Sequence, residues 1–307
     1  MAIKVFSHSE EISDNTILWR YMDIAKFCAL LTQKALWFSS VEFLAESDPY
    51  EGRLPDANYA HNRWQSLSDL SAEEIIELEN TNDYYNPGRN NPQNLEEKLE
   101  AVKFERNRRL ARYHLNRRNT FVNCWHDQPH ETVAMWQIYG SPGPGLAIRL
   151  SMSDLHFAFP PNSDVYAMRV KYLDSSAPPV EVMNIFQPMG IKRKEFQYER
   201  EIRLLKTRGN WGRDPIKIDR RSREGYEAHY IDIEPEPTER PEPGINVNVD
   251  LNHLLRDVVI SPFAPDWVEN LVNDLCWKFG IYNKVRRSNL LKKPPVFSTH
   301  SMDRIEV

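Results

Sequence analysis

The sequence is poor in glycine and cysteine and has no long hydrophobic run, and each shortage excludes a class of protein. Only 11 of the 307 residues are glycine. Neither G-x-G-x-x-G nor G-x-x-x-x-G-K-[ST] occurs, which excludes the common Gly-rich phosphate loops. The three cysteines, Cys28, Cys124 and Cys276, lie far apart in apolar runs. We therefore predict reduced core cysteines, with neither a disulfide framework nor a zinc site.

Membrane segments and a strong net charge are also missing. No stretch reaches the roughly 18 apolar residues that a membrane span needs, and the first residues lack the pattern of a signal peptide. We expect a cytoplasmic protein with no membrane partner. The net charge of -5 gives no global basic field, so any contact with nucleic acid must be local.

What the sequence does contain is enough apolar residues, 41% of the chain, for a full core. Apolar periodicity predicts helices and strands in a single α+β domain, 1–307. Strands are expected at 16–23, 35–40, 119–126, 145–150, 165–174, 199–206, 228–234, 245–250 and 257–260. Helices are expected at 24–34, 131–139 and 266–279, and a long charged helical insertion at 56–118. A Pro/Glu-rich loop at 235–244 should be exposed, and 292–307 should be a flexible tail.

The stretch FQYEREIRLLK, residues 196–206, carries the most informative charge pattern. As a strand it places Glu199, Glu201 and Arg203 on one face. Such a face is most often a solvated surface. In a site, however, one carboxylate could stabilise an oxocarbenium-like transition state while the other deprotonates a nucleophile.

Three elements in a fixed order give this stretch a context. Arg20 follows a buried Leu-Trp pair in a strand, Ser39 and Ser40 end the next strand, and the Glu-x-Glu pair comes later. This order resembles ADP-ribosyltransferase folds, in which a strand ending in Arg or His precedes a helix, a strand with Ser or Tyr, and a strand with the catalytic Glu. The resemblance implies a mixed, mostly antiparallel split sheet of ADP-ribosyltransferase type, NAD as co-substrate and no metal.

The same resemblance implies roles for individual residues. Glu201 would hold the ribose 2′-hydroxyl, Glu199 would assist as base, and Arg20 would pair with the pyrophosphate, so Arg20 and Glu201 must face one cleft. The other predicted NAD contacts are Tyr21, Ser39, Ser40, Trp125, His126 and Arg193. Of these, Trp125 offers a ring for stacking, and Arg193 belongs to a basic cluster, 192–194, that could neutralise phosphates.

A second resemblance covers most of the chain. It rests on LWRYMD, WFSSVEFLAESDPYEG, VNCWHDQPHETVAMWQIYG, GLAIRL, KRKEFQYEREIRLL and INVNVDLNHLLRDVVISPFAPDW. These segments resemble the bacterial family catalogued as domain of unknown function 2971, whose title states no activity. Function is therefore predicted from the transferase pattern: an NAD-dependent ADP-ribosyltransferase or NAD glycohydrolase, in the role of a toxin or anti-phage effector. Its acceptor could be protein, nucleic acid or water, and a partner protein could regulate it.

Two other functions fit the same residues. In a metal-dependent nuclease, Asp174, Glu199 and Glu201 would gather Mg²⁺, although Arg203 stands where a lysine is usual. In a binding module without enzymatic activity, Trp125, His126 and the basic cluster 192–194 would recognise a nucleotide or a partner, and the Glu-x-Glu strand would be ordinary surface. The spacing of His126, His130 and Glu131 matches no zinc pattern. The turn 48–52 either has no function or brings a carboxylate to the rim of the site.

Overall fold

The computed structural model describes residues 2–5, 11–58, 66–81, 92, 94–140, 145–180, 186–208 and 242–292, with the backbone alone at 105–115. The predicted strand at 228–234, residues 235–241 of the predicted loop, and 293–307 of the predicted tail lie outside these described residues.

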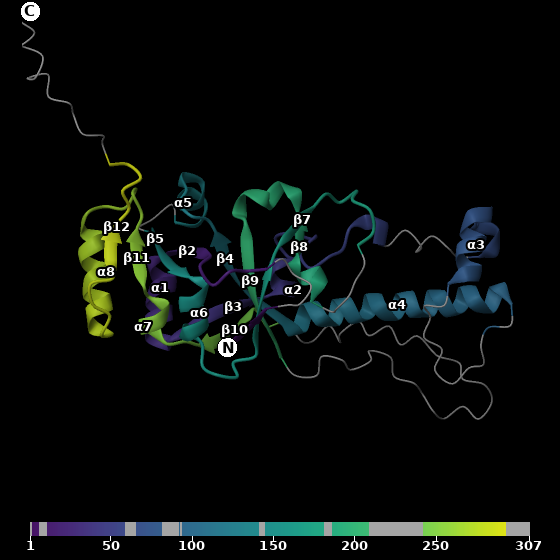
Figure 1. Cartoon of the computed structure of the whole chain (residues 1–307), viewed down its shortest axis with the longest axis horizontal. Coiled ribbons are helices and arrows are strands. Elements are labelled where there is room, and N and C mark those ends of the chain that lie inside the picture. The colour runs from purple at the N-terminus through teal and green to yellow at the C-terminus, as the bar shows by residue number, and fades with distance from the viewer. Residues whose placement is uncertain are drawn as a thin grey trace, which may run out of the picture.

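A 10-stranded mixed sheet forms the body of the molecule (Figure 1). Its main path runs in the order β1 (Ile3–Val5), β6 (Val165–Arg169), β9 (Glu201–Thr207), β4 (Thr120–Asp127), β2 (Ile17–Asp23), β5 (Gly145–Ser151), β11 (Asp257–Ile260) and β12 (Val285–Arg287). The β1–β6 and β11–β12 pairs are parallel, and the other pairs are antiparallel. The prediction of a mixed, mostly antiparallel sheet is confirmed.

The sheet divides along one edge of β4. At one end of β4, His126 and Asp127 pair with β2. At the other end, Phe121 and Val122 pair with β3 (Ala35–Ser40), which continues into β10 (Gly244–Asn248). Residues 123–125 therefore have no strand beside them on this edge among the described residues. On this edge, side chains must therefore supply the hydrogen bonds that a neighbouring strand would give to the backbone N–H and C=O groups.

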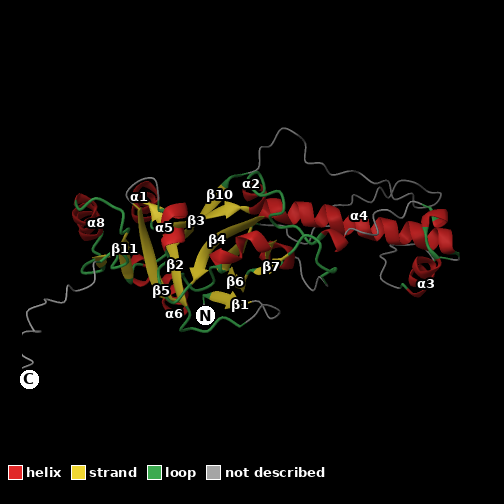
Figure 2. Cartoon of the chain, turned by 90° about the horizontal axis from the view of Figure 1, so that it is seen from above, coloured by secondary structure: helices red, strands yellow, loops and turns green. Residues whose placement is uncertain are grey.

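Helices cover both faces of the sheet (Figure 2). The main core lies on one face, where strand residues such as Leu18, Trp125 and Ile202 are buried. It is closed by α1 (Ile24–Gln33), α6 (Met152–Ala158), α7 (Leu251–Leu254) and α8 (Trp267–Lys278). The opposite face, here called the second face, is covered by α2 (Val41–Leu44), α5 (Val133–Tyr139) and the 3₁₀ helix η3 (Gln187–Gly190).

The predicted insertion is helical where the structure describes it. It contains η2 (Leu67–Asp69), α3 (Ala72–Asn80) and α4 (Leu95–Asn119). Ser71 and Glu74 form the capping box that starts α3. In Figure 1, α4 extends away from the sheet, and α3 packs near its far end through Leu78 and Leu99. None of the described helices has the length and apolar character needed to cross a membrane.

The structure also corrects the predicted strand at 165–174 and the predicted burial of the three cysteines. The expected strand 165–174 is two strands, β6 and β7 (Lys171–Leu173), and β7 pairs in parallel with β8 (Ile191–Arg193) in a separate two-stranded sheet. All three cysteines are free thiols, but only Cys276 is fully buried, whereas Cys28 and Cys124 are half-buried.

Candidate functional site

The strand predicted at 199–206 begins two residues later, at Glu201. Lys194–Glu199 form the 3₁₀ helix η4, Arg200 takes a left-handed conformation with φ 44° and ψ 57°, and β9 begins at Glu201. Within β9 the predicted alternation holds: Ile202 enters the main core while Glu201 and Arg203 lie on the second face. The sharp turn at Arg200 nevertheless keeps Glu199 buried beside this face.

Arg203 is the centre of a buried ion-pair group on the second face. Its Nε donates to Glu201 Oε1 at 2.8 Å, and its Nη2 donates to Glu201 Oε2 at 3.3 Å. Its Nη1 pairs with Glu51 and donates to the Met189 carbonyl at 2.6 Å. Burial alone would raise the pKa of Glu201, but the positive charges of Arg203 and Lys192 hold that pKa well below its ordinary value. Glu201 is therefore an ionised, fully paired carboxylate.

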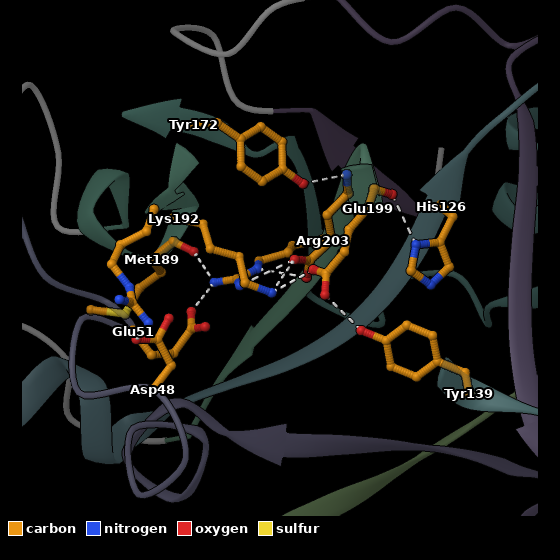
Figure 3. A network of polar contacts seen from close by, with 11 residues as sticks. Asp48, Glu51, His126, Tyr139, Tyr172, Met189, Lys192, Glu199 and Arg203 are labelled. Carbon is orange, nitrogen blue, oxygen red and sulfur yellow. Dashed lines mark hydrogen bonds and ion pairs between the residues drawn. The ribbon is translucent and has the colours of Figure 1, made fainter. Parts of the chain in front are cut away.

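Lys192 joins the two carboxylates of the predicted pair (Figure 3). Its Nζ lies 2.5 Å from Glu199 Oε2 and 3.4 Å from Glu201 Oε2. Burial opposes the charge of Lys192, yet the two glutamates raise its pKa above the ordinary value. On the other side of Glu199, the Tyr139 hydroxyl donates to Oε1 at 2.7 Å. Burial and the charge of Glu199 raise the pKa of Tyr139, so this hydroxyl stays a donor.

His126 and Tyr21 lie next to this group. The Nδ1 of His126 is 2.9 Å from the carbonyl oxygen of Glu199, and its ring lies 5.3 Å from that of Tyr139 and 5.7 Å from that of Tyr21. Burial lowers the pKa of His126. The structure therefore brings together four of the predicted site residues: Glu199, Glu201, His126 and Tyr21. We call Tyr139, Lys192, Glu199, Glu201 and Arg203 the carboxylate cluster.

The turn at 48–52 reaches the cluster, as one of its two interpretations predicted. Glu51 is buried against Arg203, and Asp48 Oδ1 lies 3.0 Å from Arg193 Nη2. Arg193 also lies over the ring of Tyr50, 5.1 Å from its centroid. The guanidinium predicted to meet NAD phosphates is thus already engaged with residues of this turn.

Arg20 does not share a face with Glu201. Trp19 pairs with His126, which pairs with Glu201, so these three residues lie on the second face and Arg20 starts from the main core face. Its Nη1 donates to the Cys124 carbonyl at 2.6 Å, in the split of the sheet. Burial lowers the pKa of Arg20. The prediction that Arg20 and Glu201 face one cleft is therefore wrong, because the two residues start on opposite faces of the sheet. Arg20 instead supplies a hydrogen-bond partner for the backbone of β4 at the split.

Three other predicted residues are also placed elsewhere. Ser39 pairs with Val122, four residues along β4 from His126, which corresponds to about 13 Å. Ser40 is fully buried beside it. Trp125 is completely buried in the main core, where its indole donates to Asn123 Oδ1 at 2.7 Å. Among the described residues, no side-chain hydrogen bond joins Ser39, Ser40 or Trp125 to a residue of the cluster.

Sequence reasoning did not single out Tyr139, Tyr172 or Lys192 as partners of the carboxylates. The Tyr172 hydroxyl accepts a hydrogen bond from the backbone of Glu201 at 2.8 Å. For Lys192, the available signal was its position in the basic cluster 192–194, next to a stretch rich in glutamate. For Tyr139, the signal was its place at the end of a short amphipathic helix that follows His126.

The metal site of the nuclease hypothesis does not assemble. Asp174 is exposed after β7, and its Oδ1 accepts hydrogen bonds from the backbone and hydroxyl of Ser176. Over the described ranges, no three His, Cys, Asp or Glu side chains come together as a metal site. The Mg²⁺ trio of Asp174, Glu199 and Glu201 is therefore not formed.

Comparisons of the chain with protein-family models, with curated proteins and with solved structures find no match. The resemblances to ADP-ribosyltransferases and to domain of unknown function 2971 remain predictions.

Proposed function

We propose that the carboxylate cluster cleaves the N-glycosidic bond between nicotinamide and ribose in NAD. The observation that supports this most is the pairing of two buried carboxylates, Glu199 and Glu201, through the single ammonium of Lys192. Buried charges held in such a group are costly to maintain, and strongly perturbed groups cluster at functional sites. An oxocarbenium-like transition state needs a fixed negative charge of this kind.

The burial of the two carboxylates favours moving the predicted ribose contact from Glu201 to Glu199. Glu201 is held by Arg203, whose side chain is only 1% exposed, so a ligand cannot replace that partner. Glu199 is held by Tyr139, which is 36% exposed, and by Lys192, whose side chain is 12% exposed. A ribose hydroxyl can reach Glu199 by displacing the tyrosine. We therefore assign the ribose contact to Glu199 and the supporting negative charge to Glu201.

The reaction follows from these positions. The bond between ribose C1′ and the nicotinamide nitrogen breaks, and its electron pair leaves with nicotinamide. The carboxylates of Glu199 and Glu201 stabilise the positive charge that develops on the ribose. An acceptor oxygen then bonds to C1′ and gives up its proton to Glu199, the carboxylate that a ligand can reach, which acts as base. With water as acceptor the product is ADP-ribose, and with a macromolecule the product is an ADP-ribosylated acceptor.

Cellular roles follow only from this chemistry. Loss of NAD would suit a toxin or anti-phage effector in the cytoplasm, with a macromolecular acceptor or a regulatory partner as further components. Of the competing functions, the nuclease has no three His, Cys, Asp or Glu side chains gathered as metal ligands among the described residues. The binding module treated Glu199 and Glu201 as ordinary surface, whereas both are buried.

Nicotinamide release tests the proposal directly. The purified chain is incubated with NAD, with and without EDTA, and free nicotinamide is assayed. We expect release in both conditions, and a loss of roughly 10²-fold or more in Glu199→Gln, since base and charge are removed while shape is kept. The control is Glu195→Gln, an exposed position in the same 3₁₀ helix. A folded wild-type chain that releases no nicotinamide, or a fully active Glu199→Gln variant, would contradict the assignment.

A further inference from the structure

A pocket of about 560 Å³ opens on the second face, away from the carboxylate cluster. Its volume lies within the roughly 300–1,000 Å³ of small-molecule sites. It is lined by Trp19, Pro129, His130, Glu131, Arg149, Asp257, Arg286, Asn289 and Leu290. The walls combine apolar surface with two arginines and two carboxylates, which is the composition of a site for a charged ligand.

Strand register fixes where this pocket lies. Glu201, His126, Trp19, Arg149 and Asp257 form one row across β9, β4, β2, β5 and β11. Arg149 is three strands from Glu201, or about 14 Å between backbones. The pocket is thus a separate place on the same face of the sheet.

Arg149 is the side chain in the pocket with the most unused bonding capacity. Within the described part of the chain it donates no hydrogen bond, and its nearest carboxylate oxygen, Asp257 Oδ2, is 3.7 Å away. Its guanidinium lies over the ring of Trp19, 5.8 Å from the centroid, and its side chain is 36% exposed. A guanidinium held against an aromatic ring, whose five N–H groups donate no hydrogen bond to any described residue, is prepared for an anion.

Arg286 adds a second guanidinium at the same end. Its Nε and Nη2 donate to the two oxygens of Asp257 at 2.9 and 2.8 Å, which fixes its orientation. One carboxylate thus lies between two guanidinium groups, and this end of the pocket keeps an excess positive charge. A phosphate group matches that charge and can accept bonds from both arginines.

The other polar side chains of the pocket are suited to a neutral polar group. Glu131 accepts hydrogen bonds from Trp136 Nε1 at 2.9 Å and from the Ser288 hydroxyl at 2.6 Å, both at Oε2. These two bonds orient the carboxylate while Oε1 keeps its lone pairs. Asn289 supplies both a donor and an acceptor. Sugar hydroxyls and the amino group of a base are the donors that such a carboxylate binds.

We propose that this pocket binds a nucleoside phosphate. Arg149 and Arg286 hold the phosphate, Glu131 and Asn289 hold the ribose or the base, and Pro129 and Leu290 form apolar walls. The site goes beyond the proposed cleavage of NAD, because none of its residues belongs to the carboxylate cluster.

Calorimetric titration of the full chain with AMP, adenosine and inorganic phosphate tests the pocket. We expect AMP to bind, and adenosine and inorganic phosphate to bind at least about tenfold more weakly, since each lacks one half of the contacts. Arg149→Gln should weaken AMP binding by about tenfold or more. The control Arg256→Gln should not, because Arg256 pairs with Asp154 outside the pocket. Absence of AMP binding, or equal AMP affinity in wild type and Arg149→Gln, would overturn the proposal.

Competition identifies the source of the nucleotide. If NAD displaces AMP, the pocket takes the adenosine phosphate half of a dinucleotide, and if NAD leaves AMP bound, it takes a separate nucleotide; both results require the pocket. Glu199→Gln should keep the AMP affinity of the wild type. AMP binding without nicotinamide release would therefore reject the proposed cleavage alone. Nicotinamide release without AMP binding would reject the pocket alone.

Discussion

Arg203 Nε lies 2.8 Å from Glu201 Oε1, and neither side chain is more than 2% exposed. An ion pair removed from water this completely gives up the hydration of both charges, and only close mutual contacts offset that loss. Glu51 completes the group on the other side of Arg203, and Lys192 completes it on the other side of Glu201. Removal of one member must therefore leave a buried charge without its partner.

Replacing Arg203 with methionine should destabilise the chain strongly. The substitution keeps most of the side-chain volume but leaves Glu51 and Glu201 with less compensation. We expect the free energy of unfolding in urea to fall by about 3–5 kcal/mol. Arg256→Met is the control, because Arg256 and Asp154 form an exposed pair that should contribute less than about 1 kcal/mol.

A triple variant gives a second test of the contribution of Arg203 to stability. The triple variant Arg203→Met, Glu51→Leu and Glu201→Leu removes all three charges, while Lys192 and Glu199 still pair with each other. It should regain much of the stability lost in Arg203→Met. A single variant as stable as the wild type would show that the buried pair contributes nothing.

Acid should destabilise the chain partly through Glu201. Its pKa in the folded chain lies well below the ordinary value of 4.5, so its contribution to stability is complete above about pH 4.5 and is lost as the pH falls further. Glu201→Gln should therefore be less stable at neutral pH and should show a shallower loss of unfolding free energy between about pH 5 and pH 2, by up to about 1.4 kcal/mol per pH unit. Urea titrations at several pH values measure both effects. Parallel pH profiles for the variant and the wild type would exclude this role.

Much of the fold could be predicted from the sequence, because local signals specify it. Short apolar-rich runs located β2 and β9, and the Ser71–Glu74 box located the start of α3. The error at 199–200 has a local cause: the left-handed conformation of Arg200 is unusual outside glycine, so the charge and apolar pattern gave no sign of the break.

The site was less predictable, because its geometry depends on pairing between distant strands. Order along the chain placed Arg20 and Glu201 in one constellation, but register puts them on opposite faces. A Glu-x-Glu pattern alone does not distinguish a solvated pair from a buried one, because the contacts with Lys192 and Arg203 that enclose this pair are tertiary. The residues that line the pocket around Arg149 come from separate strands and loops, so no single stretch of sequence predicts it.

Tyr139→Phe should lower the free energy of unfolding and also lower the KM for NAD. The variant loses the hydrogen bond to Glu199 Oε1, and a bond to a charged acceptor is worth about 1.5–3 kcal/mol. Because the ribose hydroxyl is proposed to displace this bond, KM for NAD should fall even though the free energy of unfolding falls. Tyr198→Phe, at an exposed tyrosine of the same cluster region, is the control and should change neither quantity. A raised KM in Tyr139→Phe would instead make the tyrosine a binding contact.

Arg200→Gly should stabilise the chain, in contrast to most glycine substitutions. A left-handed conformation costs an L-residue with a Cβ about 1–2 kcal/mol, and glycine avoids this cost. Glycine loses more backbone entropy on folding, by roughly 0.5–1 kcal/mol, so we expect a net gain of up to about 1 kcal/mol in unfolding free energy. Arg200→Ala keeps the Cβ and should give no such gain, which isolates backbone conformation from loss of the exposed guanidinium. If alanine and glycine change stability equally, the conformation at Arg200 carries no strain, and the position of Glu199 is set by its contacts with Lys192 and Tyr139 alone.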